Sequence, residues 1–216
     1  MSNAILTPHQ GLDIDERLTL RQYRAIYAAG YRFVARYLYN EGKRNSCLTL
    51  EEAQDIKKAG LVCVAIVESG FPTRDEYFSA KQGIIDGGNA RVAAKNVGMP
   101  ASEPIYFTVD YDAQQPALDA RIVPYFEAVN RELTGVVNAE MPAYDVAAYG
   151  SKLVLAHLYN RHLIKRSWQA YAPGWGGSEI EMHCDLVQTT GGRTSPLGLN
   201  ADCDVSNGNA GGWVPA

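Results

Sequence analysis

A helix that ends in glycine and runs straight into an apolar segment occurs twice near the start of the chain. The first copy is LTLRQYRAIYAAG before YRFVARYLY (residues 18–39), and the second is LTLEEAQDIKKAG before LVCVAIVES (residues 48–69). Thr19 with Gln22, and Thr49 with Glu52, have the spacing of a helix-capping box, and a glycine can take the left-handed conformation that ends a helix. The pattern predicts consecutive helix-then-strand units.

Five such strands are predicted, and a helix follows each of them. They lie near Gly11–Asp15, Arg32–Tyr39, Leu61–Ser69, Pro104–Asp112 and Asp145–Gly150. A helical region from Thr73 to Gly98 is expected to be interrupted at Gly87 and Gly88, a fourth helix from Pro116 to Leu133 to break at Pro124, and a fifth to begin at Ser151. These connections are long enough for the crossovers that parallel strands require.

The rhythm changes after the fifth helix. Three more strands, in RSWQAYAP, MHCDLVQTT and LNADCDVS, are separated by short glycine-rich segments. No crossover helix fits between them, so we expect hairpin-like loops and antiparallel strands. The sequence therefore predicts one α/β domain over residues 5–216, a TIM-type barrel of the (β/α)5(β)3 kind, with residues 1–4 as a cloning remnant. An open doubly wound sheet is the alternative. The first and the last of the eight strands carry a similar D-x-D pattern, and this favours closure into a barrel.

Composition excludes several classes of function. The 216 residues have a formal net charge of −4 and no block of Lys or Arg, so nucleic acids and anionic membrane surfaces are not expected partners. No apolar stretch is long enough for membrane insertion, and the first ten residues do not resemble a signal peptide, so localisation stays open. The four cysteines lack C-x-x-C spacing, so we expect no metal bound through thiolates. We also expect no metal elsewhere, no cofactor, and a monomeric protein.

Three predicted strands end in the same acidic pattern. The pairs are Asp13 with Asp15, Asp110 with Asp112, and Asp202 with Asp204. Alternate residues of a strand share a face, and β/α barrels place their active sites at the carboxyl ends of the strands. Any one aspartate could equally cap a helix or close a turn. Gathered together, however, carboxylates raise one another's pKa, which produces a proton donor beside an ionised partner.

Other side chains at the strand ends suit a sugar site. Aromatic rings stack on pyranose faces, and a carboxylate can accept hydrogen bonds from hydroxyl groups. We expect Arg36 to lie beside the acids and hold one of them ionised. Glu68 adds a carboxylate at the end of the third strand. The aromatic candidates are Tyr37, Tyr39, Tyr111, Tyr149, Trp168, Tyr171 and Trp175.

The segments GLDID, PIYFTVDYD, AAYGS, SWQAY, LVQTT and ADCDVS, in that order, resemble the strands of family 25 glycoside hydrolases, the Chalaropsis-type lysozymes. FVARYL and GNARVAAKNVGMPASEPIYFTVDYD are similar to a group of uncharacterised bacterial glycoside-hydrolase-like domains related to those lysozymes. The resemblance covers nearly the whole chain. It implies a (β/α)5(β)3 barrel and cleavage of the β-1,4 bond between N-acetylmuramic acid and N-acetylglucosamine.

The resemblance also implies roles for individual residues. Asp112 stands where the lysozymes carry the Glu proposed as general acid, with its carboxyl one methylene closer to the backbone. Asp13 and Asp202 match the acids of the first and last strands, and Asp110 assists at the sugar ring. We also expect Asp15, Asp204 and Gln188 to bind the substrate.

These inferences predict a hydrolase of a cell-wall polysaccharide, with peptidoglycan as partner, acting outside the cytoplasm or delivered to the wall. Two alternatives stay open: a barrel that binds glycans without cleaving them, and a divalent-cation site among the aspartates.

Overall fold

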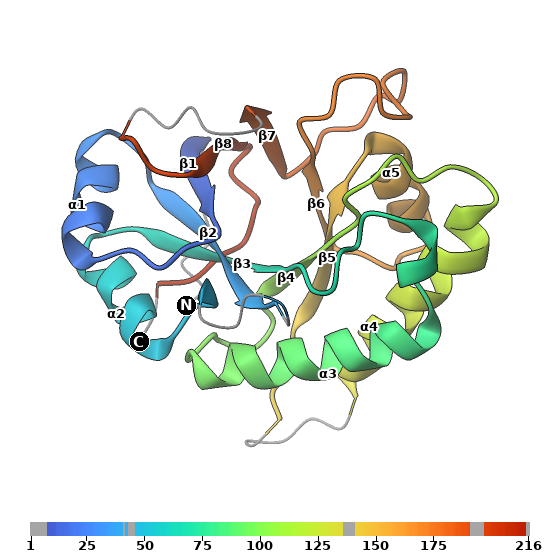
Figure 1. The fold of residues 1–216 in the computed structure, drawn as a ribbon, viewed down its shortest axis with the longest axis horizontal. Coiled ribbons are helices and arrows are strands. Elements are labelled where there is room, and N and C mark those ends of the chain that lie inside the picture. The colour runs from blue at the N-terminus through green and yellow to red at the C-terminus, as the bar shows by residue number, and fades with distance from the viewer. Residues whose placement is uncertain (1–7, 41, 43–45, 136–140, 191–196, 215–216) are drawn as a thin grey trace.

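Eight strands close into a barrel in a computed structural model that describes residues 8–40, 42, 46–135, 141–190 and 197–214. The strands follow one another around the ring in chain order, and the last pairs with the first (Figure 1). They are β1 (His9–Ile14), β2 (Phe33–Tyr39), β3 (Val62–Val67), β4 (Pro104–Thr108), β5 (Asp145–Gly150), β6 (Arg166–Gln169), β7 (Leu186–Thr190) and β8 (Ala201–Ser206). The predicted barrel is confirmed, and the open sheet is excluded.

Strand direction differs from the prediction in the last part of the ring. β6 runs parallel to β5, and β7 runs parallel to β6, whereas β8 is antiparallel to both β7 and β1. The expectation of three antiparallel strands is therefore wrong for β6 and β7. Residues 170–185 lead from β6 to β7 without a helix, and sixteen residues of irregular chain are long enough to return to the opposite end of the barrel. Only the β7–β8 connection joins antiparallel neighbours, and its residues 191–196 lie outside the described part.

In the described part of the chain, five α-helices cover part of the barrel. α1 and α2 lie side by side on one flank, and α3 packs along α4 on another (Figure 1). Thr19 and Gln22 form the predicted capping box, Ser151 caps α5, and Gly30 and Gly60 take positive φ angles. The helices are α1 (Leu20–Ala28), α2 (Leu50–Lys58), α3 (Ala80–Asn96), α4 (Val123–Thr134) and α5 (Lys152–Asn160), with a 3-10 turn η2 (Asp75–Tyr77) and a π-helical segment η3 (Leu118–Ile122).

α3 continues through Gly87 and Gly88, so the predicted interruption there is wrong. Gly83 and Gly87 lie against α4: a Cβ atom at Gly83 would overlap the Tyr125 carbonyl oxygen, and one at Gly87 would come within 2.8 Å of the Glu132 Cβ. These glycines let two helices approach closely, and this packing offsets their low helix propensity. The break expected at Pro124 falls at the start of α4, where proline is tolerated because the first helical N–H groups lack intrahelical partners.

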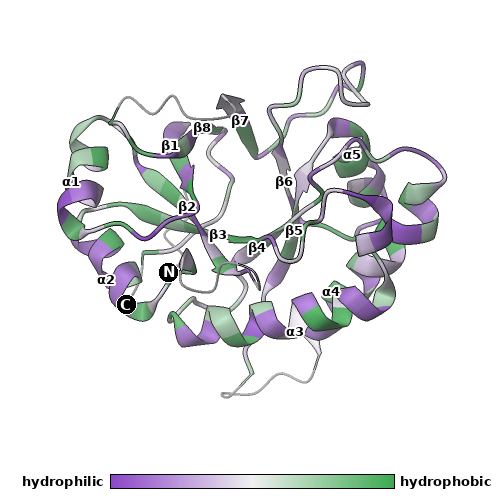
Figure 2. Ribbon diagram, in the orientation of Figure 1, coloured by the Kyte–Doolittle hydropathy of each residue, from purple (hydrophilic) through white to green (hydrophobic). Residues whose placement is uncertain are grey.

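The apolar core has two layers. The larger lies between the barrel wall and the helices, and Figure 2 shows apolar and polar residues interspersed along those helices. The smaller fills the lower barrel interior with Phe33, Tyr106, Trp168 and smaller apolar side chains. A Cβ atom at Gly11 would overlap the Phe33 ring, so the glycine makes room for that ring. The interior is therefore closed below and becomes polar towards the carboxyl ends of the parallel strands.

The segment after β8 packs against the lower part of the barrel, which the sequence patterns did not predict. Its Trp213 is buried and forms an antiparallel bridge with Cys63 in β3. The Tyr106 hydroxyl donates a hydrogen bond to the Ala210 carbonyl oxygen at 2.8 Å. The segment thus covers apolar side chains of the barrel interior.

No helix among the described residues combines the length and apolarity needed to cross a membrane.

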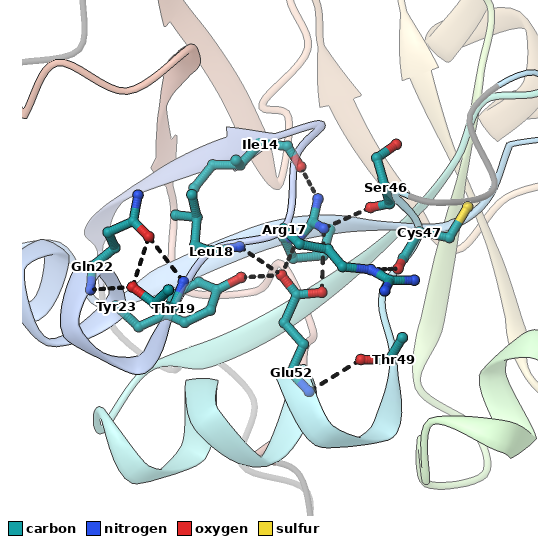
Figure 3. Close-up of polar contacts among 11 residues, drawn as sticks. Ile14, Arg17, Leu18, Thr19, Gln22, Tyr23, Ser46, Cys47, Thr49 and Glu52 are labelled. Atoms are coloured by element: carbon teal, nitrogen blue, oxygen red, sulfur yellow. Dashed lines mark hydrogen bonds and ion pairs between the residues drawn. The ribbon is translucent and has the colours of Figure 1, made fainter.

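A buried ion pair joins the barrel wall to the first two helices (Figure 3). Arg36 of β2 and Glu52 of α2 are both buried, and Arg36 Nε lies 3.2 Å from Glu52 Oε1. Glu52 also accepts hydrogen bonds from the Tyr23 hydroxyl at 2.6 Å and from the Leu18 N–H at 3.2 Å. Arg36 donates further to the carbonyl oxygens of Ile14 and Ser46. The Glu52 side chain is thus turned to Arg36, and only the Thr49 half of the second predicted capping box forms.

We expect Glu52→Gln to lower the free energy of unfolding by about 3–5 kcal/mol, because it leaves the Arg36 charge buried without a counter-charge. Glu51→Gln, at an exposed position one residue earlier in α2, is the matched control and should change it by no more than about 0.5 kcal/mol. Urea denaturation measures both values. Equal unfolding midpoints for the two variants would contradict a stabilising role of the ion pair.

Candidate active site

The antiparallel pairing of β1 with β8 brings three of the predicted aspartates together. Asp13 lies directly opposite Asp202, and Asp204 lies opposite Gly11, the residue two positions before Asp13. Residues two apart on a strand share a face, and directly opposed residues have Cβ atoms about 4.5–5.5 Å apart. The two acidic strand ends therefore converge inside the barrel, as the sequence predicted.

Gln188 of β7 connects this cluster to the aromatic side of the site. Its amide nitrogen donates to Asp13 Oδ2 at 3.2 Å and to Asp202 Oδ2 at 3.0 Å. Its amide oxygen accepts from the Tyr149 hydroxyl and from the Tyr171 backbone N–H, both at 3.0 Å. Both ends of the buried amide are thereby satisfied, and two carboxylates are held at fixed positions.

Asp13 and Asp204 are the deepest carboxyl groups of the cluster. Burial and the neighbouring charge of Asp202 raise the pKa of Asp13 to about 7. Burial and the charge of Asp13 raise the pKa of Asp204 well above its ordinary value. Asp204 Oδ1 accepts a hydrogen bond from Trp168 Nε1 at 2.9 Å, while its Oδ2 is buried and accepts none. The raised pKa favours the protonated form of Asp204, whose hydroxyl can donate to the neighbouring Asp13 side chain.

The acidic pair that follows β4 divides between two environments. Burial raises the pKa of Asp110, and its carboxyl has no hydrogen-bond partner among the described residues. Asp112 is exposed, and its Oδ1 accepts hydrogen bonds from the Gly176 N–H and from Gln114 Nε2, both at 2.7 Å. Asp110 is therefore a carboxyl without a partner in the described chain, whereas Asp112 ties the end of β4 to the β6–β7 loop.

A central cavity of about 280 Å³ opens above the apolar floor, and Asp13, Asp110 and Asp202 all line it. A second cavity of about 190 Å³ shares Asp13, Tyr37, Glu68 and Asp202 with the first and extends past Asp15, Asn40 and Asn200. Four acidic side chains line each cavity. Asp112 lines neither of them, so the structure gathers three of the four expected acids around one space.

The aromatic candidates separate into three groups. Tyr37, Tyr149, Trp168 and Tyr171 line the central cavity, and the Trp168 ring is edge-on to Tyr149. Burial and nearby carboxylates raise the pKa of Tyr37 and Tyr149, so both hydroxyls stay protonated; Tyr37 donates to Glu68 at 3.4 Å. Trp175 lines a separate cavity beside the first. Tyr39 and Tyr111 line none of these cavities, and Tyr111 stacks on Phe78 instead.

The expectation that Arg36 lies beside the aspartates is wrong. The inner face of β2 carries Phe33, Ala35 and Tyr37, so Arg36 points outward to α2. Its carboxylate partner is Glu52, and its side chain is fully buried, so it cannot contact a ligand in the barrel mouth. The apolar residues on both faces of β2 left its facing ambiguous in the sequence, and the partner of Arg36 lies on a helix whose contact with the strand no local pattern indicates.

Sequence reasoning did not identify several lining residues. The alternation of β4 put Thr108 on the inner face with Asp110, but we did not assign it to the site, and it lines the central cavity. Asn40, Ser46 and Asn200 line the second cavity from loops. Loop residues lack a periodic pattern, so no signal pointed to those three.

The model of the Rv2525c-like, glycoside hydrolase-like domain family matches residues 24–205. The chain belongs to this family. It is 29% identical over 168 residues, 74% of its length, to the uncharacterised Bacillus subtilis protein YbfG, and it spans only 23% of that relative. The inferred relationship to uncharacterised bacterial barrel domains is thereby confirmed.

Solved structures confirm the fold. The Tat-secreted Mycobacterium tuberculosis protein Rv2525c, in complex with HEPES, superposes with a TM-score of 0.74 at 20% identity over 96% of this chain and 99% of that one. The Streptococcus pneumoniae autolysin LytC, in complex with a synthetic peptidoglycan ligand, gives 0.59 at 14% identity over 92% of this chain and 46% of that one. A glycosyl hydrolase of family 25 shares the barrel as well. At these identities the likeness concerns the fold.

The raised pKa values of Asp13 and Asp204 predict that the protein becomes less stable as the pH rises. A carboxyl with a higher pKa in the folded state keeps a proton that the unfolded chain loses near pH 3.8. For Asp13 the free energy of unfolding should fall between pH 3.8 and about 7, by at most about 1.4 kcal/mol per pH unit. Urea denaturation across this range measures the slope, and stability that rises with pH would contradict the assignment.

Asp204→Asn replaces the carboxyl with a neutral amide, which has N–H donors and keeps an acceptor for the Trp168 N–H. We expect this variant to be at least as stable as the wild type above pH 7 and to show a shallower pH slope. Asp204→Ala removes the acceptor of the buried Trp168 N–H and should cost about 1–3 kcal/mol. Urea denaturation compares the two variants. If Asp204→Asn is as destabilising as Asp204→Ala, the carboxyl of Asp204 is ionised in the folded protein.

Proposed function

We propose that this domain hydrolyses β-1,4 glycosidic bonds in the glycan strands of peptidoglycan, with Asp110 as the proton donor. The observation that carries the proposal is the central cavity: a partly buried carboxyl without a partner in the described chain lines it together with the Asp13–Asp202 pair. Glycoside hydrolysis uses two carboxyl groups of this kind, one protonated and one ionised, on either side of the scissile bond. Family membership and the fold shared with an autolysin crystallised with a peptidoglycan ligand support the choice of substrate.

The environments of Asp110 and of the Asp13–Asp202 pair suggest a different catalytic role for each. Burial favours the neutral form of Asp110, so at moderate pH it can give its proton to the glycosidic oxygen as the bond from that oxygen to the anomeric carbon breaks. The proton held by Asp13 leaves Asp202 as the ionised partner, which stabilises the positive charge developing at the sugar ring. A water molecule then adds to the anomeric carbon, and its proton returns to a carboxylate.

Tyr149, Tyr171 and Trp168 supply the other half of a sugar site in this proposal. Their rings line the cavity beside the carboxyl groups, where a pyranose face could stack on the more exposed Tyr171. The Gln188 amide holds Tyr149 and the Tyr171 backbone in register with the acids. The role of Asp112 changes accordingly: the resemblance suggested the general acid, but we propose that Asp112 positions the β6–β7 loop.

Substitution of the two β4 aspartates tests this assignment. Asp110→Asn cannot deliver a proton, so release of new reducing ends from purified peptidoglycan should fall at least about 100-fold while glycan binding persists. Asp112→Asn retains an oxygen that accepts from Gly176, so its kcat should stay within about tenfold of the wild type. The reverse order of effects would restore Asp112 as the acid. Binding without release by the wild type, on several glycans, would show a glycan-binding barrel instead.

The pH dependence of hydrolysis offers a second test. An acid must be protonated to act, and the raised pKa of Asp110 extends its protonated form to higher pH. We expect kcat to fall on the alkaline side, with a midpoint above the ordinary aspartate value of 3.8. Reducing-end assays from about pH 4 to about pH 9 measure this limb. A kcat that keeps rising with pH over the whole range would contradict a carboxyl donor.

A further inference from the structure

A third cavity, of about 240 Å³, continues the barrel mouth beyond the acids. Tyr171 lines both this cavity and the central one, so the two spaces adjoin. The end of β6, the start of α5 and the β6–β7 loop form its walls, and Trp175 contributes a second aromatic ring. A glycan strand lying over the central cavity can extend into this neighbouring space.

The loop that carries Trp175 is fastened on both sides. The Gly176 N–H donates to Asp112 at 2.7 Å, and the Leu153 N–H of α5 donates to the Gly176 carbonyl oxygen at 3.3 Å. Gly177 has a φ of +91°, and a Cβ atom there would overlap the Leu153 backbone nitrogen. Such close backbone contact fixes the loop to the scaffold, so the walls of the cavity are preformed.

The electrostatics of this cavity are opposite to those of the acidic end. Among the described residues, Lys152 is the one charged side chain that lines it. The Lys152 ammonium donates to the Ile180 carbonyl oxygen at 3.2 Å, and in the described parts of the chain it forms no ion pair with a carboxylate. The cavity across the mouth is lined by Asp13, Asp15, Glu68 and Asp202. The lining of the mouth thus carries four carboxylates at one end, and at the other end one ammonium and, behind the Gly176 N–H, the hydrogen-bonded carboxylate of Asp112.

We propose that the third cavity is a subsite for a sugar that carries a carboxylate, with Lys152 recognising the carboxylate and Trp175 packing against the ring. The inference rests on the proposed function, because the sugar is the neighbour of the one held at the acids. A carboxylate at the opposite end would face the acidic cavity and be repelled, so the two ends together set the direction in which a charged glycan lies. Sugars with a lactyl ether or a uronic acid group have the required chemistry.

Calorimetry with two tetrasaccharides of equal length tests the subsite. One alternates N-acetylglucosamine with carboxylate-bearing N-acetylmuramic acid, and the other is neutral chitotetraose. In an Asp110→Asn background, which prevents turnover, the protein should bind the charged tetrasaccharide about three- to tenfold more tightly at low salt. Adding Lys152→Met should abolish that preference, and Lys152→Arg should retain it. Trp175→Ala should weaken binding of both sugars alike.

Lys58→Met, at an exposed position of α2 paired with Asp55, is the matched control and should leave the preference unchanged. A preference for the charged sugar that survives Lys152→Met, or equal binding of both sugars by the parent protein, overturns the subsite. If the wild type still releases reducing ends in that case, the proposed function stands. Failure of the wild type to cleave any glycan refutes the proposed function, whereas the binding preference and its loss in Lys152→Met decide the subsite inference.

Discussion

The antiparallel pairing between the first and last strands is the constraint on which the rest of the molecule depends. It closes the ring, and it brings residues at the two ends of the chain into direct opposition, with Asp13 facing Asp202. Gly11 has no side chain, and this leaves room beside the paired strands for the Phe33 ring, which fills part of the apolar floor. Without closure, β1 and β8 would be open sheet edges, and the acidic cluster would not exist.

Closure places carboxyl groups where burial disfavours their charge. Two effects offset this cost. The raised pKa values of Asp13 and Asp204 favour their neutral forms. Hydrogen-bond donors also stabilise the carboxyl groups, because Trp168 donates to Asp204 and Gln188 donates to Asp13 and Asp202. In proteins, replacing buried charged groups by apolar side chains of similar volume is often neutral or stabilising. A site kept at such a cost is the usual sign of function, because proton donors and ionised partners arise from this kind of crowding.

The barrel wall separates two polar systems with different tasks. Outside, Arg36 and Glu52 are buried and mutually neutralised, and they join β2 to the helices. Inside, Asp110 lines a space with no protein partner among the described residues. The D-x-D at the end of β4 shows the same division: Asp110 faces the cavity, and Asp112 holds the backbone of the loop after β6. A satisfied carboxylate stabilises the structure, whereas an unsatisfied one is available for chemistry.

The sequence by itself determined the β/α units, the capped helix starts, the glycine helix ends, the number of strands and the clustering of aspartates at strand ends. Each of these follows from local signals: hydrophobic period, capping residues and two-residue alternation. Only the tertiary structure decided that β7 runs parallel to β6, that Arg36 pairs with Glu52, that Asp112 holds a loop, and that the last segment packs against the floor. These features depend on which distant residues meet, and a local pattern specifies the face of a side chain but not its partner.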